Sequence, residues 1–238
     1  MPEEKDLRCR ILDARDICQR IAEHVAALCI SSNDILKNIS KESSNGTLRN
    51  AFVLTLLALE ETGKLFRVWQ AAANVEDHAS DLIVRDLFSN HQAKGGLAGD
   101  LCCQMLDYTY TVLGSDSESQ NLNSVQRGML AEARDHLKET YQDFKTIREI
   151  VMYTANDQER CWHGMSTKVG RNIGVENLLL MMVASGAQAY LESGGRFSLA
   201  TKGLLDIQKG VHSDDAFAFT GRMAYGFLKL AGKEKEEV

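Results

Sequence analysis

Several charged side chains fall inside segments that are otherwise apolar. The stretch Ala58–Lys64 (ALEETGK) carries Glu60, Glu61 and Lys64 within a strongly hydrophobic helical pattern. A carboxylate in such surroundings must be paired or protonated, because burying it alone is costly. Two arrangements are open. Either Glu60 pairs with Lys64 one turn along while Glu61 faces water, or these side chains belong to a polar cluster that other helices complete.

Gly63 is a second unusual residue in this segment. Glycine in the middle of a helix costs roughly 1 kcal/mol of helix stability relative to alanine. A close approach by another helix at this point would give the glycine a structural reason.

Arg148 is an arginine on a face that apolar residues mark as buried. The spacing of Leu137 and Phe144 along the same predicted helix places Arg148 on their stripe. A guanidinium there requires a carboxylate or a phosphate. Glu60 or Glu61 would be a suitable carboxylate, so a structural ion pair and a phosphate-binding site are both open.

His91 and Lys94 share one face near the end of a predicted helix. Cations near a helix C-terminus are favourable without any function. The pair therefore gains meaning only if it meets the carboxylates from the other segment.

Composition and motifs exclude several classes of function. The net charge of −6 and the pI near 5.6 argue against a DNA-coating protein or a binder of anionic membranes. The first residues, MPEEKDLRCR, have no apolar signal core, and the most apolar run is about half as long as a membrane span requires. We therefore expect a cytoplasmic protein with reduced cysteines.

Metal and nucleotide motifs are also missing from the sequence. Glu132–His136 and Glu159–His163 have i,i+4 spacing, which differs from the Glu-x-x-His of di-iron bundles. The cysteines lack zinc-ligand spacing, and no HExxH, Walker A, GxGxxG or GxSxG motif occurs. We predict no metal and no cofactor.

The hydrophobic pattern predicts an all-α protein forming a single domain over residues 1–238. Pro2 is the only proline, which favours long uninterrupted helices. We expect Gly95–Gly96 to end a helix and residues 153–170 to form an ordered loop. The predicted helices cover about residues 7–40, 48–73, 78–93, 97–113, 124–152, 173–192, 197–208 and 214–230.

Three segments resemble motifs of the AbiV-type abortive-infection family, a branch of the helical HEPN superfamily. Residues 58–64 (ALEETGK) are similar to its A-x-E-E-x-G-K helix, and residues 88–94 (FSNHQAK) are similar to its F-x-x-H-x-x-K segment. Residues 148–153 (REIVMY) resemble an Arg-then-Tyr element that closes a long helix. The resemblance implies a HEPN-like bundle, with its core at about 7–192 and additional C-terminal helices at about 196–232.

The same resemblance implies a bacterial phage-defence protein, a homodimer, and metal-independent cleavage of RNA. HEPN ribonucleases use an arginine and a histidine a few residues apart. Arg85 and His91 have that spacing, but six steps along a helix turn about 240°, so they converge only if the helix breaks. In Arg148–Tyr153 the histidine is replaced by tyrosine, whose pKa of about 10 makes it a poorer base at neutral pH.

These residues lead to a hypothesis about roles. Arg148 would grip the scissile phosphate, and His91 or Tyr153 would move the proton. Glu60, Glu61, Lys64, Lys94 and Arg85 would complete the binding site. Two alternatives remain: a non-catalytic bundle that binds a phage or host protein, and a regulator that binds an anion or nucleotide.

Overall fold

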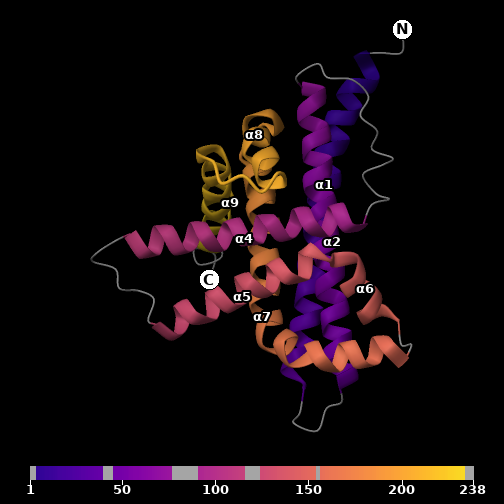
Figure 1. Ribbon diagram of the computed structural model, residues 1–238. Coiled ribbons are helices and arrows are strands. Elements are labelled where there is room, and N and C mark those ends of the chain that lie inside the picture. The colour runs from indigo at the N-terminus through magenta and orange to yellow at the C-terminus, as the bar shows by residue number, and fades with distance from the viewer. Residues whose placement is uncertain (1–3, 40–44, 77–90, 116–123, 154–155, 234–238) are drawn as a thin grey trace.

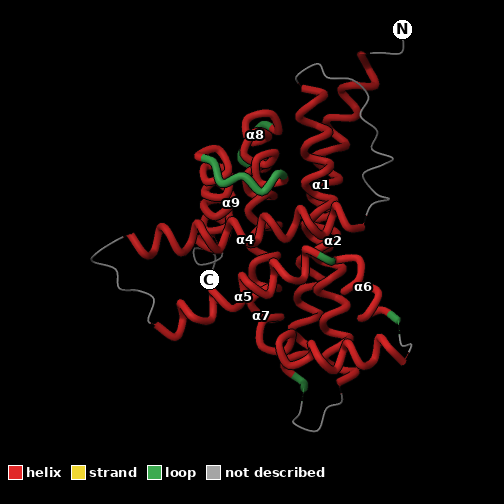
Figure 2. The backbone as a smooth tube through the Cα atoms, in the orientation of Figure 1, coloured by secondary structure: helices red, strands yellow, loops and turns green. Residues whose placement is uncertain are grey.

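The computed structural model describes residues 4–39, 45–76, 91–115, 124–153 and 156–233, and nearly all of them are helical. The described residues contain no strand, which confirms the predicted all-α class (Figure 2). No helix among them is both long and apolar enough to cross a bilayer. The helices are α1 (Glu4–Lys37), α2 (Asn45–Glu76), α4 (His91–Ser115), α5 (Ser124–Gln142), α6 (Phe144–Met152), α7 (Asn156–Glu192), α8 (Phe197–Gln208) and α9 (Asp214–Lys233).

The long helices α1 and α2 form the centre of the molecule. They pack along each other, α4 crosses α2 at a steep angle, and α5 packs on α4 (Figure 1). Helix α6 lies against α2, α4 and α7, and α7 packs on α1, α2 and α9. Helices distant in the sequence therefore surround the middle of α2, the segment that carries the unusual carboxylates.

The C-terminal helices complete the same hydrophobic core. The indole N–H of Trp69 on α2 donates a hydrogen bond to the carbonyl of Phe197 at 3.1 Å. The Trp69 ring also meets the rings of Phe197 and Phe219 edge to face. All three side chains are almost fully buried, so α8 and α9 are bound to α2 by aromatic packing.

Three boundary predictions are wrong. Helix α4 runs straight through Gly95 and Gly96, the predicted stop, while residues 78–90 of the predicted preceding helix lie outside the described residues. The predicted loop at 153–170 is mostly the first half of α7. Few of its side chains are buried, and one of them is the polar Ser166, so the apolar period is weak. The predicted helix at 124–152 is interrupted at Asp143, which separates α5 from α6.

Candidate functional site

Glu60 lies at the middle of α2 and joins three helices. Its side chain is 7% exposed, and its Oε1 accepts hydrogen bonds from Lys94 Nζ at 3.0 Å and from His91 Nδ1 at 2.7 Å. Its Oε2 forms an ion pair with Arg148 Nε at 3.5 Å. Side chains from α2, α4 and α6 thus meet at one carboxylate. We call Glu60, His91, Lys94 and Arg148 the Glu60 cluster.

The electrostatics of this cluster favour an ionised Glu60. Burial by itself raises the pKa of the carboxyl, but hydrogen bonds from Lys94 and His91 and their positive charge outweigh it and hold the pKa below its ordinary value. Two basic side chains, Lys94 and Arg148, contact this one carboxylate. Arg148 is the more exposed of the two, and a guanidinium is well suited to bind an additional anion such as phosphate.

Gly63 allows α4 to approach α2 closely enough for this contact. A Cβ at Gly63 would lie 2.0 Å from the carbonyl oxygen of Lys94 and 2.7 Å from its Cα. Only a residue without a side chain leaves room for the backbone of α4 at this point. The close helix contact suggested by the sequence is present, and it delivers the 1% exposed Lys94 side chain to Glu60.

Arg148 reaches Glu60 because α6 begins anew after Asp143. The buried ring of Phe144, at the start of α6, packs over Gly95, where a Cβ would lie 2.5 Å from it. Arg148 follows one turn later, and 24% of its side chain is exposed. Its Nε is buried and forms no hydrogen bond among the described residues, so charge attraction to Glu60 holds this end of the guanidinium.

His91 is placed to act as a base. An ionised carboxylate can only accept hydrogen bonds, so the proton between Glu60 and His91 resides on Nδ1. In the neutral imidazole, the other ring nitrogen, Nε2, is then the one that can accept a proton. The His91 side chain is 44% exposed, so a ligand from solvent can reach the imidazole.

The other predicted site residues that the structure describes, Glu61, Lys64 and Tyr153, do not join the cluster. Lys64 contacts Glu61 rather than Glu60, in a pair one turn along α2, so of the two arrangements left open by the sequence the Glu60–Lys64 pair is not the one that forms. Tyr153 is 56% exposed at the end of α6, and its backbone N–H caps the carbonyl of Glu149. Arg85 lies outside the described residues.

Sequence reasoning missed a second buried pair, His136 with Glu176. The Nδ1 of His136 on α5 contacts Oε1 of Glu176 on α7, and the residues are 3% and 1% exposed. A signal was present, because His136 directly precedes the core residue Leu137 on the buried stripe of its helix. Both groups are too enclosed to meet a substrate, so we assign the pair to the joining of α5 and α7.

No cluster of three or more metal-binding side chains occurs within the described ranges. Five cysteines there, Cys18, Cys29, Cys102, Cys103 and Cys161, are free thiols. Comparison of the chain with protein-family models, curated proteins and solved structures gives no match. The function of the site is therefore argued from its own residues, with the Glu60 cluster as the candidate.

Proposed function

We propose that this protein cleaves RNA without a metal ion, as a HEPN-like bundle that acts in bacterial abortive infection. The observation that carries the proposal is the Glu60 cluster. It brings a partly exposed guanidinium, that of Arg148, and a partly exposed imidazole, that of His91, together on one buried carboxylate. The motif resemblance described above supports the biological setting.

In the proposed reaction Arg148 binds the scissile phosphodiester through its guanidinium. Nε2 of His91 removes the proton from the ribose 2′-hydroxyl, and the 2′-oxygen attacks phosphorus. The P–O5′ bond breaks, the products being a 2′,3′-cyclic phosphate and a 5′-hydroxyl. His91 returns its proton to the leaving 5′-oxygen. Glu60 orients His91 and Arg148, and the charge on Arg148 stabilises the pentacoordinate intermediate.

Replacing Arg148 with alanine is expected to lower the rate of RNA cleavage by about 100-fold or more, the usual loss when one donor to a developing oxyanion is removed. The assay is cleavage of total RNA by purified protein in excess EDTA. Arg148→Lys should restore only part of the rate, because lysine keeps the charge but lacks the planar pair of donors.

Tyr153→Phe is the matched control for the proton carrier. Tyr153 ends α6, the helix that carries Arg148, but lies outside the cluster, so the rate of RNA cleavage should stay within about 2-fold of wild type. His91→Gln should reduce that rate as strongly as Arg148→Ala. Loss of activity in Tyr153→Phe would reassign the base. An inert wild type would reject catalysis; stabilisation of that inert protein by nucleotides or phosphate would favour the anion-binding regulator.

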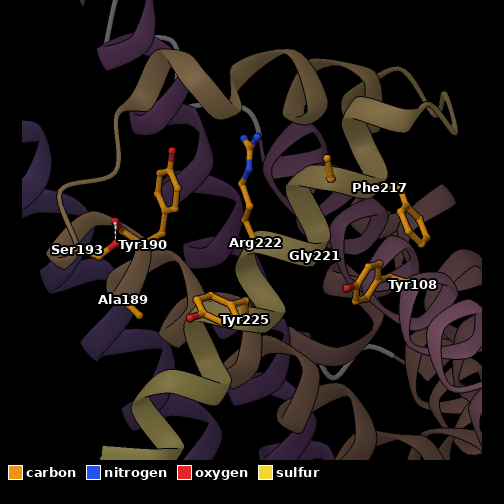
Figure 3. Close-up of a pocket in the computed structure, with 9 residues that line it drawn as sticks. Tyr108, Ala189, Tyr190, Ser193, Phe217, Gly221, Arg222 and Tyr225 are labelled. Carbon is orange, nitrogen blue, oxygen red and sulfur yellow. Dashed lines mark hydrogen bonds between the residues drawn. The ribbon is translucent and has the colours of Figure 1, made fainter.

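The proposed homodimer has a suitable surface on α9. A groove of about 590 Å³ runs beside this helix, walled by Tyr108 of α4 and Tyr190 of α7. Phe217 and Tyr225 are 40% and 70% exposed there, which is unusual for large aromatic side chains. Figure 3 shows Tyr108 and Phe217 adjacent at one end of the groove and Tyr225 between them and Tyr190.

Two copies of this face are complementary when the helices run antiparallel. Phe217, Gly221 and Tyr225 follow each other at one-turn steps along α9. A two-fold axis at Gly221 places Tyr225 of one copy against Phe217 of the other, and the reverse. The Tyr108 ring of the same chain lies over Gly221, where a Cβ would be 3.1 Å from it, so this ring belongs to the centre of the face.

The double variant Phe217→Ser/Tyr225→Ser is expected to weaken self-association by about 30-fold or more, because aromatic anchors dominate such interfaces. Sedimentation velocity over a concentration series measures this. Val211→Ser, which changes a 46% exposed apolar residue outside the groove, is the control and should not alter association. A monomeric wild type, or a dimer insensitive to the double change, would contradict this surface.

A further inference from the structure

A side chain from α4 lies inside the interruption between α5 and α6. In a continuous helix the N–H of Lys145 would donate to the carbonyl of Tyr141, four residues earlier. Instead, the Lys145 N–H donates to Oε1 of Gln92 at 2.8 Å, and Nε2 of Gln92 donates to the Tyr141 carbonyl at 3.0 Å. Between them, Asp143 has φ −134° and ψ 47°, which is not helical. The amide of Gln92 replaces one helical hydrogen bond with two.

This insertion gives partners to two backbone groups that the break separates. Insertion of a side chain into the hydrogen-bond ladder is an established cause of sharp helix kinks. The Tyr141 carbonyl and the Lys145 N–H both keep a hydrogen bond, which lowers the cost of the break. An amide can do this because it carries a donor and an acceptor on one planar group.

Apolar contacts hold both sides of the break against the same helix. The Tyr141 ring covers Gly99 and the Phe144 ring covers Gly95, so closely that a Cβ added at either glycine would lie only 1.7 Å and 2.5 Å from the respective rings. Helix α4 therefore packs against α5 at Gly99 and against α6 at Gly95, on the two sides of the break. The break then directs α6 so that Arg148 meets Glu60.

We propose that Gln92 is a positioning residue that sets the place of Arg148 by keeping the helix open at Asp143. Its neighbours His91 and Lys94 hold Glu60 from α4, so one short segment builds the site from both sides. The expected effect of Gln92 on RNA cleavage rests on the proposed ribonuclease function. Its expected effect on the helix break at Asp143 is independent of that function.

The test is the Gln92→Ala variant, followed by two separate measurements. With the amide gone, the Tyr141 carbonyl and the Lys145 N–H should bond directly and α5 should continue into α6. Backbone carbon chemical shifts at Asp143 should then change from non-helical to helical values. RNA cleavage should fall by about 100-fold, the order expected for a misplacement near 1 Å in an active site.

A second-site change distinguishes positioning from general stabilisation. Proline at position 145 lacks the N–H and clashes with the carbonyl four residues back, so it prevents a continuous helix. Lys145→Pro added to Gln92→Ala should therefore recover most of the lost cleavage, which Lys145→Ala should not. Gln104→Ala, on the same helix, removes a comparable hydrogen bond to His212 and should leave both the Asp143 shifts and the rate unchanged.

The outcomes separate this proposal from the ribonuclease proposal. If Asp143 stays non-helical in Gln92→Ala, the insertion does not cause the break and the positioning role is wrong. If Asp143 becomes helical while the wild type never cleaves RNA, the positioning role stands and the ribonuclease function falls. The third outcome is that Asp143 is again non-helical in the double variant Gln92→Ala/Lys145→Pro while RNA cleavage stays as slow as in Gln92→Ala. That result would overturn the link between the helix break and the position of Arg148.

Discussion

Replacing Glu60 with alanine is expected to lower the free energy of unfolding by about 3–5 kcal/mol, the range found when one partner of a buried ion pair is removed. Lys94 is 1% exposed and would lose the carboxylate that it contacts at 3.0 Å. Arg148 and His91 would lose the same partner. Urea denaturation followed by circular dichroism measures the loss, and Lys94→Met in the same chain should recover part of it by removing the buried cation.

The matched control is Glu61→Ala, the next residue on the same helix. Glu61 pairs with Lys64, and 17% and 21% of their side chains are exposed. Breaking this solvated pair should cost about 1 kcal/mol or less. Equal losses in the two variants would show that Glu60 holds no special place in the core.

The pH dependence of stability provides a second measurement of the Glu60 contribution. The pKa of Glu60 is lower in the folded chain than its ordinary value. Its stabilising contribution is therefore present above the unfolded pKa of about 4.3 and is lost as the pH falls through the folded pKa. The stability difference between wild type and Glu60→Gln should shrink on acidification over this window. A constant difference would contradict the lowered pKa.

Replacing Gly63 with alanine is expected to destabilise the fold by about 3 kcal/mol, the upper end for overpacking. The new Cβ would lie 2.0 Å from a backbone oxygen of α4, and backbone cannot turn aside as a flexible side chain can. The higher helix propensity of alanine, worth about 1 kcal/mol, offsets only part of this. The same denaturation experiment measures it, and RNA cleavage should fall as Lys94 and His91 move away from Glu60.

Gly96→Ala serves as the comparison for the glycine effect. Gly96 also lies within a helix, but a Cβ there meets nothing within 4 Å. Alanine at this position should leave stability unchanged or raise it by up to about 1 kcal/mol. A Gly63→Ala variant as stable as Gly96→Ala would mean that α2 and α4 are not in close contact.

Helical content was predictable because local patterns carry it. The apolar spacing in α1, α2, α8 and α9 follows the turn of a helix, and the bounds differ from those predicted by only a few residues. The Ser213 cap of α9 was predictable for the same reason, and its hydroxyl accepts from the Ala216 N–H at 3.1 Å. The first half of α7 was missed because its buried stripe is sparse and includes a polar residue, Ser166, between Trp162 and Val169.

The sequence by itself determined that Glu60 and Arg148 need charged partners. A charge within an apolar helix requires compensation wherever the chain folds, so Glu60 and Arg148 were recognisable from their surroundings. Tertiary structure alone decided which partners they take. Glu60 pairs with Lys94, 34 residues away, and not with the neighbouring Lys64, because Gly63 lets α4 approach α2 at that point. The insertion of Gln92 could not be predicted from the sequence either. No sequence pattern marks the glutamine, because its hydrogen-bond partners depend on how α4 crosses α5 and α6.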